Sequence, residues 1–252
     1  MVRLYEVTKE EKYLETAKDL MEWIKTGWND YAGGGIAWEK TSHEADKNAC
    51  SNGPAALLAM RLYEVTKDND YMDWAKKIYE WEKATLFNPA TGAIYDGING
   101  LTGELNTVTL SYNQGTFVGA AYHLFKATGD EIYLNDARKC ANYTISSSNV
   151  IDTSNNILRD EGTGDGGLFK GIFMRYFRQI LDEPALDQAY RKKFTTFFNN
   201  NAEVLWRNGV NKKDLLFNSS WSTPVVGTTQ LTSHVSGCTM IEMRASHEAE
   251  AK

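Results

Sequence analysis

The sequence predicts an all-α fold, a toroid with an inner and an outer ring of helices, from three observations. A seven-residue run, RLYEVTK, stands at 3–9 and recurs at 61–67 in a chain of 252 residues. Helices of two kinds alternate along the sequence, and the connections between them alternate between short and long. Self-similarity at a fixed period is the signature of a repeat architecture.

The repeat extends beyond the shared heptapeptide and has a period of about sixty residues. At an offset of 58 the matching pairs are Tyr13 and Tyr71, Ala17 and Ala75, Leu20 and Ile78, and Trp23 and Trp81. An offset of 62 matches Thr66 to Thr128 and Tyr71 to Tyr133, and a weaker fourth copy follows at an offset of 52. A solenoid of the tetratricopeptide kind would repeat every ~34 residues. The longer period therefore favours the toroid.

Each unit contains two kinds of helix. At 13–24 the apolar residues recur with the spacing of an amphipathic helix, which predicts an outer helix. The segments PAALLAMRLYEV (54–65) and GTFVGAAYHLFKA (115–127) are apolar around most of their circumference and rich in small residues. Such helices are buried on nearly all sides, so we expect them in the inner ring.

The connections from an outer to the next inner helix are long. They cover 27–52, 87–113, 147–167 and 208–229, whereas only a few residues lead from an inner to an outer helix. Loops of this length in a compact domain are usually functional. We expect all four, called the rim loops below, to lie over the N-termini of the inner helices and to contain short β-hairpins, one of them at 92–100.

Composition excludes several classes of function. A net charge of −6 and a pI near 5.3 argue against a nucleic-acid partner, because phosphate binding needs a basic face. No apolar run approaches the ~20 residues that span a bilayer, and the opening residues show no signal-peptide pattern. Three cysteines without CxxC spacing and four histidines without an HExxH motif predict no metal site, and no motif predicts a cofactor.

The rim loops combine tryptophan, tyrosine, glycine, amides and carboxylates, which favours a neutral polyhydroxylated ligand. Aromatic rings can stack on the apolar face of a sugar, while amides and carboxylates bind its hydroxyl groups. The candidate ligand contacts are Trp38, Asn48, Tyr112, Asn113, Gln114, Asp165 and Lys170, with Asp96 and Glu161 as further candidates. Structural roles compete with this interpretation: Trp38 could cover the core, and Lys170 could be an ion-pair partner of Asp165. Asn48 and Asn52 could be helix N-caps, a role favoured for Asn52 because it precedes Gly53-Pro54.

Four stretches carry a resemblance to a known family: TGWND…GGGIAWEK, KNACSNGPAALLAMRLYEVTKDNDYMDWAKKIYEW, LSYNQGTFVGAAYHLFKATGDEIYL and GTGDGGLFKGIFMRYF. Over almost its whole length the chain resembles glycoside hydrolase family 76, the endo-α-1,6-mannanases. The resemblance implies an (α/α)6 barrel, cleavage of α-1,6-linked mannan with retention of configuration, and an extracytoplasmic or surface-attached location. The partner would be a mannan-like polysaccharide or oligosaccharide, and we expect a monomer.

The resemblance also implies roles for single residues. Seven positions match the family's cleft motifs and would bind substrate: Trp38, Asn48, Tyr112, Asn113, Gln114, Asp165 and Lys170. Departures are modest, with Ala37 where an aromatic residue is common and Gly167-Leu168 where a Pro-Gln or similar pair is frequent.

The family's catalytic carboxylates are an adjacent Asp-Asp pair, placed just upstream of the inner helix that ends in the RLYEVT-like run. Here that place falls before Met1, and the sequence contains no Asp-Asp dipeptide. If other acids catalyse, the candidates are Asp165, Asp96 and Glu161. The first RLYEVTK copy also has only half an inner helix before it. We therefore expect one toroid domain over 1–252 with about nine of the barrel's twelve helices, and a chain that is a fragment without hydrolytic activity of its own.

Two other functions remain open from the sequence. A non-catalytic glycan-binding protein on the same fold would need the same aromatic and amide groups but no catalytic pair. A sugar epimerase would rely on histidines at the rim, where only His43 and His234 are expected. A protein-interaction scaffold would not need such long loops rich in glycine and aromatic residues.

Overall fold

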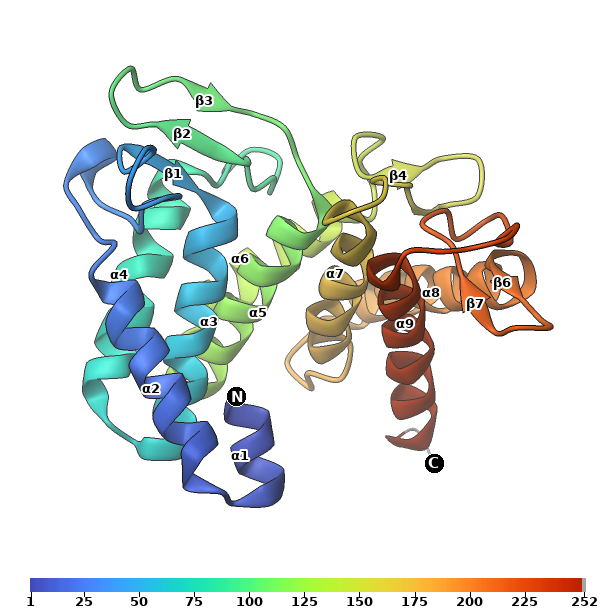
Figure 1. The fold of residues 1–252 in the computed structure, drawn as a ribbon, viewed down its shortest axis with the longest axis horizontal. Coiled ribbons are helices and arrows are strands. Elements are labelled where there is room, and N and C mark those ends of the chain that lie inside the picture. Colours follow the sequence, from blue (N-terminus) through green and yellow to red (C-terminus); the bar gives the residue numbers. More distant parts are fainter. Residues whose placement is uncertain (251–252) are drawn as a thin grey trace. The chain divides into compact units, whose positions relative to one another are not determined.

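The structure is a computed structural model that describes residues 1–250, and it is mostly helical, as predicted (Figure 1). Its α-helices within this range are α1 (Val2–Thr8), α2 (Glu11–Lys25), α3 (Ala49–Thr66), α4 (Asn69–Thr85), α5 (Ser111–Thr128), α6 (Glu131–Thr144), α7 (Gly166–Leu181), α8 (Gln188–Val204) and α9 (Leu231–Glu250). The long connections precede α3, α5, α7 and α9. This confirms the alternation of short and long connections.

The strands are short and lie in the rim loops. Strands β1 (Asp46–Asn48), β2 (Gly97–Asn99) and β3 (Leu105–Asn106) form an antiparallel sheet in the order β1-β2-β3. Two separate hairpins are formed by β4 (Ile151–Asp152) with β5 (Ile157–Leu158) and by β6 (Val210–Asn211) with β7 (Leu216–Phe217). A 3₁₀ turn, η1 (Tyr31–Gly33), and a π turn, η2 (Leu205–Gly209), complete the elements.

The predicted hairpin at 92–100 lies further along the chain, where β2 pairs with β3 across 97–106. The turn follows Asn99, whose Oδ1 accepts hydrogen bonds from the N–H groups of Leu101 (3.0 Å) and Thr102 (2.9 Å). Gly103 then takes the left-handed conformation with φ 74°. Asparagine side chains that bond to the backbone two residues on are typical turn formers.

The described chain forms two compact units. The first comprises 1–89, 94–108 and 119–135, and the second comprises 90–93, 109–118 and the residues from Asp136 onward. Helix α5 contributes its first turns to the second unit and its later turns to the first. A single toroid domain over 1–252 stays a prediction.

The heptapeptide repeat is the C-terminus of an inner helix, as the sequence indicated. In both copies the last helical threonine donates a hydrogen bond from its hydroxyl to the carbonyl four residues earlier, Thr8 to Leu4 and Thr66 to Leu62, each at 2.8 Å. The following lysine has φ 59° in both, and its N–H bonds back to a tyrosine carbonyl. A left-handed residue after the last turn is a common helix terminator. Thr128 repeats the hydroxyl bond in α5, with Gly129 as the left-handed residue.

Small residues allow inner helices of the second unit to approach closely. A Cβ added to Gly115 on α5 would lie 2.6 Å from the Cα of Phe173 on α7. One added to Gly171 on α7 would lie 2.9 Å from the Cα of Ser236 on α9. At such separations only glycine fits, because the obstacle is backbone rather than a movable side chain.

Glu82 on α4 has a buried carboxyl group. Its side chain is fully buried, and neither carboxylate oxygen has a hydrogen-bond partner within residues 1–250. Burial raises the pKa of this carboxyl well above its usual range. Ionising Glu82 therefore opposes folding at neutral pH.

Replacing Glu82 by methionine is expected to raise the free energy of unfolding by about 1–3 kcal/mol at pH 8, because a buried unsatisfied polar group is removed at similar length. A carboxyl with a raised folded-state pKa costs stability as pH rises through that pKa, so the gain should shrink toward pH 4. Urea unfolding at both pH values measures this, with the exposed Glu80→Met on the same helix as control. A loss of stability at pH 8 would contradict it.

Candidate functional site

The first rim loop is organised around the fully buried Lys47. The Lys47 ammonium donates hydrogen bonds to Asn29 Oδ1 (2.5 Å) and to the carbonyl oxygens of Gly35 (3.1 Å) and Glu44 (3.3 Å). Burial lowers the pKa of Lys47 to about 8, against the opposing effect of the Glu44 and Asp30 carboxylates. One side chain thus holds three parts of the loop in place.

Asn52 fixes the same loop to helix α3. Its Oδ1 accepts the N–H of Ile36 (2.8 Å), and its Nδ2 donates to the carbonyls of Ile36 (3.1 Å) and Asn48 (2.9 Å). The N-cap role expected for Asn52 was wrong, because α3 begins at Ala49. The other candidate, Asn48, is the N-cap residue, although its side chain makes no capping hydrogen bond. Within the first turn of the helix, the buried Asn52 amide instead pairs with a passing extended segment.

An open cleft of about 630 Å³ lies in the first unit beside the three-stranded sheet. Its lining includes Trp38, Asn48 and Asp96, three of the residues singled out from the sequence. The Trp38 side chain is 50% exposed, with its ring 4.9 Å from that of His43. Asp96 Oδ2 accepts a hydrogen bond from the side chain of Asn106 (3.0 Å).

The rest of this lining is mostly polar, with Ile98 and Leu105 as its apolar side chains. Further carboxylates and amides come from the sheet and its flanks, namely Asp46, Asn99, Glu104 and Asn106. The cleft therefore presents one exposed indole face among several hydrogen-bonding groups.

In the second unit, the start of α5 meets the start of α7. The rings of Tyr112 and Phe169 stack with centroids 4.0 Å apart and 28° between their planes. Asn113 and Gln114 are fully buried, and Gln114 Oε1 lies 3.5 Å from the Cys140 thiol. The polar cluster of the YNQG motif is thus packed within the unit, and its contact with a ligand stays a prediction.

Glu161 holds the N-terminus of α5. One carboxylate oxygen accepts the backbone N–H of Ser111 at 2.8 Å, and the other accepts the Ser111 hydroxyl. Burial raises the pKa of Glu161, while its bonds to Ser111 act in the opposite direction. A carboxylate at a helix N-terminus is also stabilised by the helix dipole. These contacts support a structural role for Glu161.

Lys170, in α7, is 2% exposed and fixes the fourth rim loop. Its ammonium donates to the carbonyl of Ser219 and lies 4.9 Å from the centre of the Trp221 ring. Burial lowers the pKa of Lys170 to about 8, against the effects of Asp160 and Glu161. The structure thus joins Lys170 to Ser219 rather than to Asp165, which is exposed just before α7 and makes no capping hydrogen bond.

The structure therefore groups Trp38, Asn48 and Asp96 in the first unit. It groups Tyr112, Glu161 and Lys170 near the helix starts of the second. Lys47 was missed by sequence reasoning. Lysine before the inner-helix motif NACSNG carries no local signal of burial, because the loop that encloses it folds back from distant residues.

Two absences concern only the described part of the chain. In residues 1–250 no cluster of three or more His, Cys, Asp or Glu side chains could hold a metal ion. No helix found there combines the length and the apolarity of a membrane span.

Comparison with known proteins places this geometry in context. The sequence model described as Glycosyl hydrolase family 76 matches residues 1–252. The structure is similar to that of the GH76A α-1,6-mannanase from Salegentibacter sp. HEL1_6, with a TM-score of 0.92 and 42% identity, covering 98% of this chain and 72% of that one. It is also similar to the Lin0763 protein from Listeria innocua, with a TM-score of 0.89 and 35% identity, covering 98% and 69% of the two chains.

Curated relatives include two yeast proteins named mannan endo-1,6-alpha-mannosidase DCW1. The one from Candida glabrata is 28% identical over 189 residues, 69% of this chain and 40% of the relative. The one from Saccharomyces cerevisiae is 30% identical over 133 residues, 49% of this chain and 29% of the relative. The chain thus spans 40% or less of the length of these two. From its family match and its helical fold, this chain belongs to glycoside hydrolase family 76, whose enzymes have an α/α toroid.

Proposed function

We propose that this chain binds α-1,6-linked mannan as the substrate-binding part of a family 76 mannanase. The observation that carries the proposal is the cleft in which the half-exposed Trp38 stands among Asn48, Asp96 and further amides and carboxylates. An indole face can stack on a mannose ring while these groups bind its hydroxyls. An inactive variant of the Salegentibacter enzyme, a structural neighbour, has been solved in complex with α-1,6-mannotetrose.

The same proposal holds that these 252 residues do not cleave the polysaccharide alone. Retaining glycosidases use two carboxyl groups about 5–5.5 Å apart, one as acid and base and the other as nucleophile. A variant of the Salegentibacter enzyme with two consecutive aspartates replaced is described as inactive, and this sequence contains no Asp-Asp dipeptide. The contacts of Glu161 with Ser111 support a helix-holding role over a catalytic one. Asp96 and Asp165 are proposed as substrate contacts.

Isothermal titration of the chain with the α-1,6-linked mannose tetrasaccharide tests the binding, and a reducing-end assay on the same mixture tests the absence of cleavage. We expect binding without release of new reducing ends. Trp38→Ala should weaken binding roughly tenfold, the factor that corresponds to loss of ~1.4 kcal/mol from an aromatic contact. Trp206→Ala is the matched control, because Trp206 is 48% exposed and lies in η2, outside the cleft.

Three outcomes separate the alternatives. Undetectable binding, or equal effects of the two substitutions, would overturn the proposed cleft. Release of reducing ends by the 252-residue chain would overturn the proposal that it does not cleave mannan alone. A longer chain carrying the Asp-Asp segment of the Salegentibacter enzyme should hydrolyse mannan; if it binds but does not cleave, the non-catalytic glycan-binding function is favoured.

A further inference from the structure

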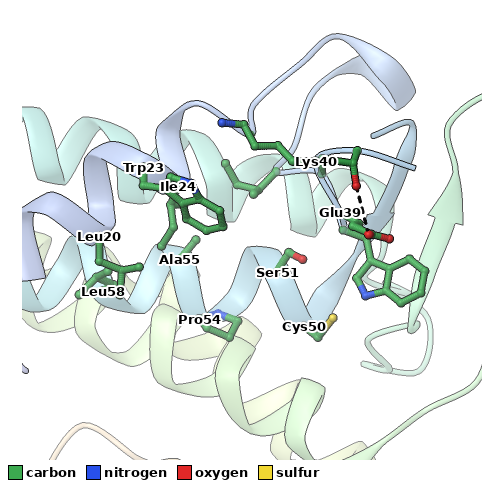
Figure 2. A pocket seen from close by; sticks show the side chains of 15 residues that line it. Leu20, Trp23, Ile24, Glu39, Lys40, Cys50, Ser51, Pro54, Ala55 and Leu58 are labelled. Atoms are coloured by element: carbon green, nitrogen blue, oxygen red, sulfur yellow. Dashed lines mark hydrogen bonds between the residues drawn. The ribbon is translucent and has the colours of Figure 1, made fainter. Parts of the chain in front are cut away.

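Trp38 stands where the cleft beside the three-stranded sheet meets a second cavity of the first unit. The second cavity is an apolar groove of about 620 Å³ between α2 and α3, and Trp38 lines both (Figure 2). The next residue, Glu39, lines the groove but not the cleft, and it lies at the end of the groove away from Leu20 and Leu58 (Figure 2). Because the indole borders both cavities, its orientation decides how much of its face the cleft receives.

One ring packs against the half-exposed Trp38 side chain. Within residues 1–250 this ring is the imidazole of His43, with 4.9 Å between the ring centroids and 58° between the planes. A tilted arrangement in this distance range is favourable for aromatic pairs. The backbone closes the loop over the same stretch, because the Trp38 N–H donates to the Asp46 carbonyl (2.8 Å) and the Asp46 N–H donates to the His43 carbonyl (3.2 Å). His43 is thus placed to fix the orientation of the indole.

Glu39 in turn holds the imidazole. His43 Nδ1 lies 2.8 Å from Glu39 Oε2, and the same oxygen accepts the Ser42 hydroxyl at 2.8 Å. The other carboxylate oxygen, Oε1, accepts the Thr41 hydroxyl at 3.3 Å, the bond drawn as a dashed line in Figure 2. The bond to His43, followed by the bond to Ser42, lowers the pKa of Glu39. Both oxygens of this carboxylate are engaged, so it offers the imidazole a fixed acceptor.

We propose that His43 is a positioning residue for mannan binding, which holds the Trp38 indole toward the cleft while Glu39 holds the imidazole. This inference rests on the proposed mannan-binding function of the cleft. His43 is not among the residues that line the cleft, so it would act on the sugar through Trp38 rather than by contact.

This arrangement should make mannan binding depend on pH. Imidazole side chains ordinarily gain their proton between pH 8 and pH 5, and a cation beside an indole is attracted to the face of the ring. Protonated His43 would also form an ion pair with Glu39, the one carboxylate within ion-pair distance of it in residues 1–250. The Lys40 ammonium lies elsewhere, 5.9 Å from the centre of the Trp23 ring. We therefore expect tighter binding at pH 5.5 than at pH 8. The other charged groups around the indole are the carboxylates that line the cleft, Asp46, Asp96 and Glu104.

Isothermal titration of the 252-residue chain with the α-1,6-linked mannose tetrasaccharide, at pH 5.5 and pH 8, tests the proposal. The parent chain should bind about threefold more tightly at pH 5.5. His43→Ala should weaken binding about fivefold at pH 5.5, the factor that corresponds to loss of an aromatic pair, and should remove the pH dependence that His43 causes. His43→Phe keeps a ring beside Trp38, so it should restore the affinity but not the pH dependence. Lys40→Ala, at an exposed position of the same loop, is the control and should bind like the parent chain.

A double-mutant cycle separates positioning from direct contact with the sugar. In a Trp38→Ala background, His43→Ala should have no further effect on affinity, because the side chain through which it acts is gone. An equal effect of His43→Ala in both backgrounds would overturn the positioning role, and so would an unchanged affinity of the single variant.

Tryptophan fluorescence reads the contact between His43 and Trp38 without a ligand. The Trp38 signal is the difference between the parent chain and Trp38→Phe, and a protonated imidazole in contact with the indole should quench it as the pH falls from 8 to 5.5. His43→Phe should abolish this quenching, and Lys40→Ala should leave it unchanged. Absence of quenching in the parent chain would contradict the proposed contact. If the parent chain does not bind the tetrasaccharide, the proposed function fails and the positioning role fails with it. Normal binding that is insensitive to His43 overturns the positioning role alone.

Discussion

Replacing Lys47 by methionine is expected to lower the free energy of unfolding by about 3–5 kcal/mol and to release the first rim loop. The substitution removes three hydrogen bonds from the Lys47 ammonium, to Asn29 Oδ1 and to the carbonyls of Gly35 and Glu44. Hydrogen bonds of charged groups contribute about 1.5–3 kcal/mol each. The loss is smaller than their sum because each acceptor keeps a second donor on Asn29 or Tyr31. Hydrogen exchange should show faster exchange across 29–46 while α6 is unchanged. Lys40→Met, an exposed lysine of the same loop, is the charge-matched control.

The free energy of unfolding that Lys47 contributes should depend on pH with a definite sign. The pKa of Lys47 is about 8 in the folded chain and near its ordinary value of 10.5 when unfolded. Between these values the unfolded chain binds more protons, so the free energy of unfolding contributed by Lys47 rises with pH across this window. Lys170, with the same lowered pKa, contributes in the same direction.

Urea unfolding between pH 7 and pH 10 separates the two lysines. Lys47→Met should reduce the rise in the free energy of unfolding over this pH range. The part of the rise that Lys170 contributes should remain. If Lys47→Met unfolds at the same urea concentration as Lys40→Met at every pH, the buried lysine does not hold the loop.

The repeat made the helices and their ends predictable. A threonine followed by lysine or glycine terminates α1, α3 and α5 by local hydrogen bonds, and local chemistry of this kind is visible in the sequence. The long connections were predictable for the same reason, since they lie between periodic segments. The start of α3 was not, because the buried Asn52 binds Ile36, sixteen residues away, instead of capping the helix.

The candidate site was predictable in composition but not in arrangement. Trp38 and Asp96 could be chosen as chemically suitable, but only the pairing of β1 with β2 brings their loops together. Glu161 looked like a candidate catalytic acid, and its contact with Ser111, 50 residues away, has no sequence signal. The burial of Glu82 is equally hidden, because glutamate is a residue type that is rarely fully buried. Tertiary contacts at long sequence separation account for each of these differences.

Gly115→Ala is expected to destabilise the chain by about 3 kcal/mol, although the substitution adds a single methyl group. Gly115 ends the YNQG motif on α5, and the Cβ would lie 2.6 Å from Cα and 3.1 Å from N of Phe173 in the FKGIF motif on α7. Because these atoms belong to the backbone, no change of rotamer relieves the contact, and the two helices must move apart. Such overpacking typically costs 1–3 kcal/mol, with larger values where the backbone resists.

The separation of α5 from α7 should also be visible at Tyr112 and Ser111. The stacking of Tyr112 on Phe169 joins the starts of α5 and α7, and the bonds from Ser111 to Glu161 join the start of α5 to the loop before α7. Both contacts should loosen when the two helices separate. Gly129→Ala provides the control: it lies at the other end of α5 with φ 73° and open space around it, so it should cost only ~1–2 kcal/mol of backbone strain. Urea unfolding compares the free energies of unfolding of the two variants. A Gly115→Ala chain as stable as Gly129→Ala would mean that α5 and α7 are not in backbone contact, and the two motifs would then owe their proximity to side chains alone.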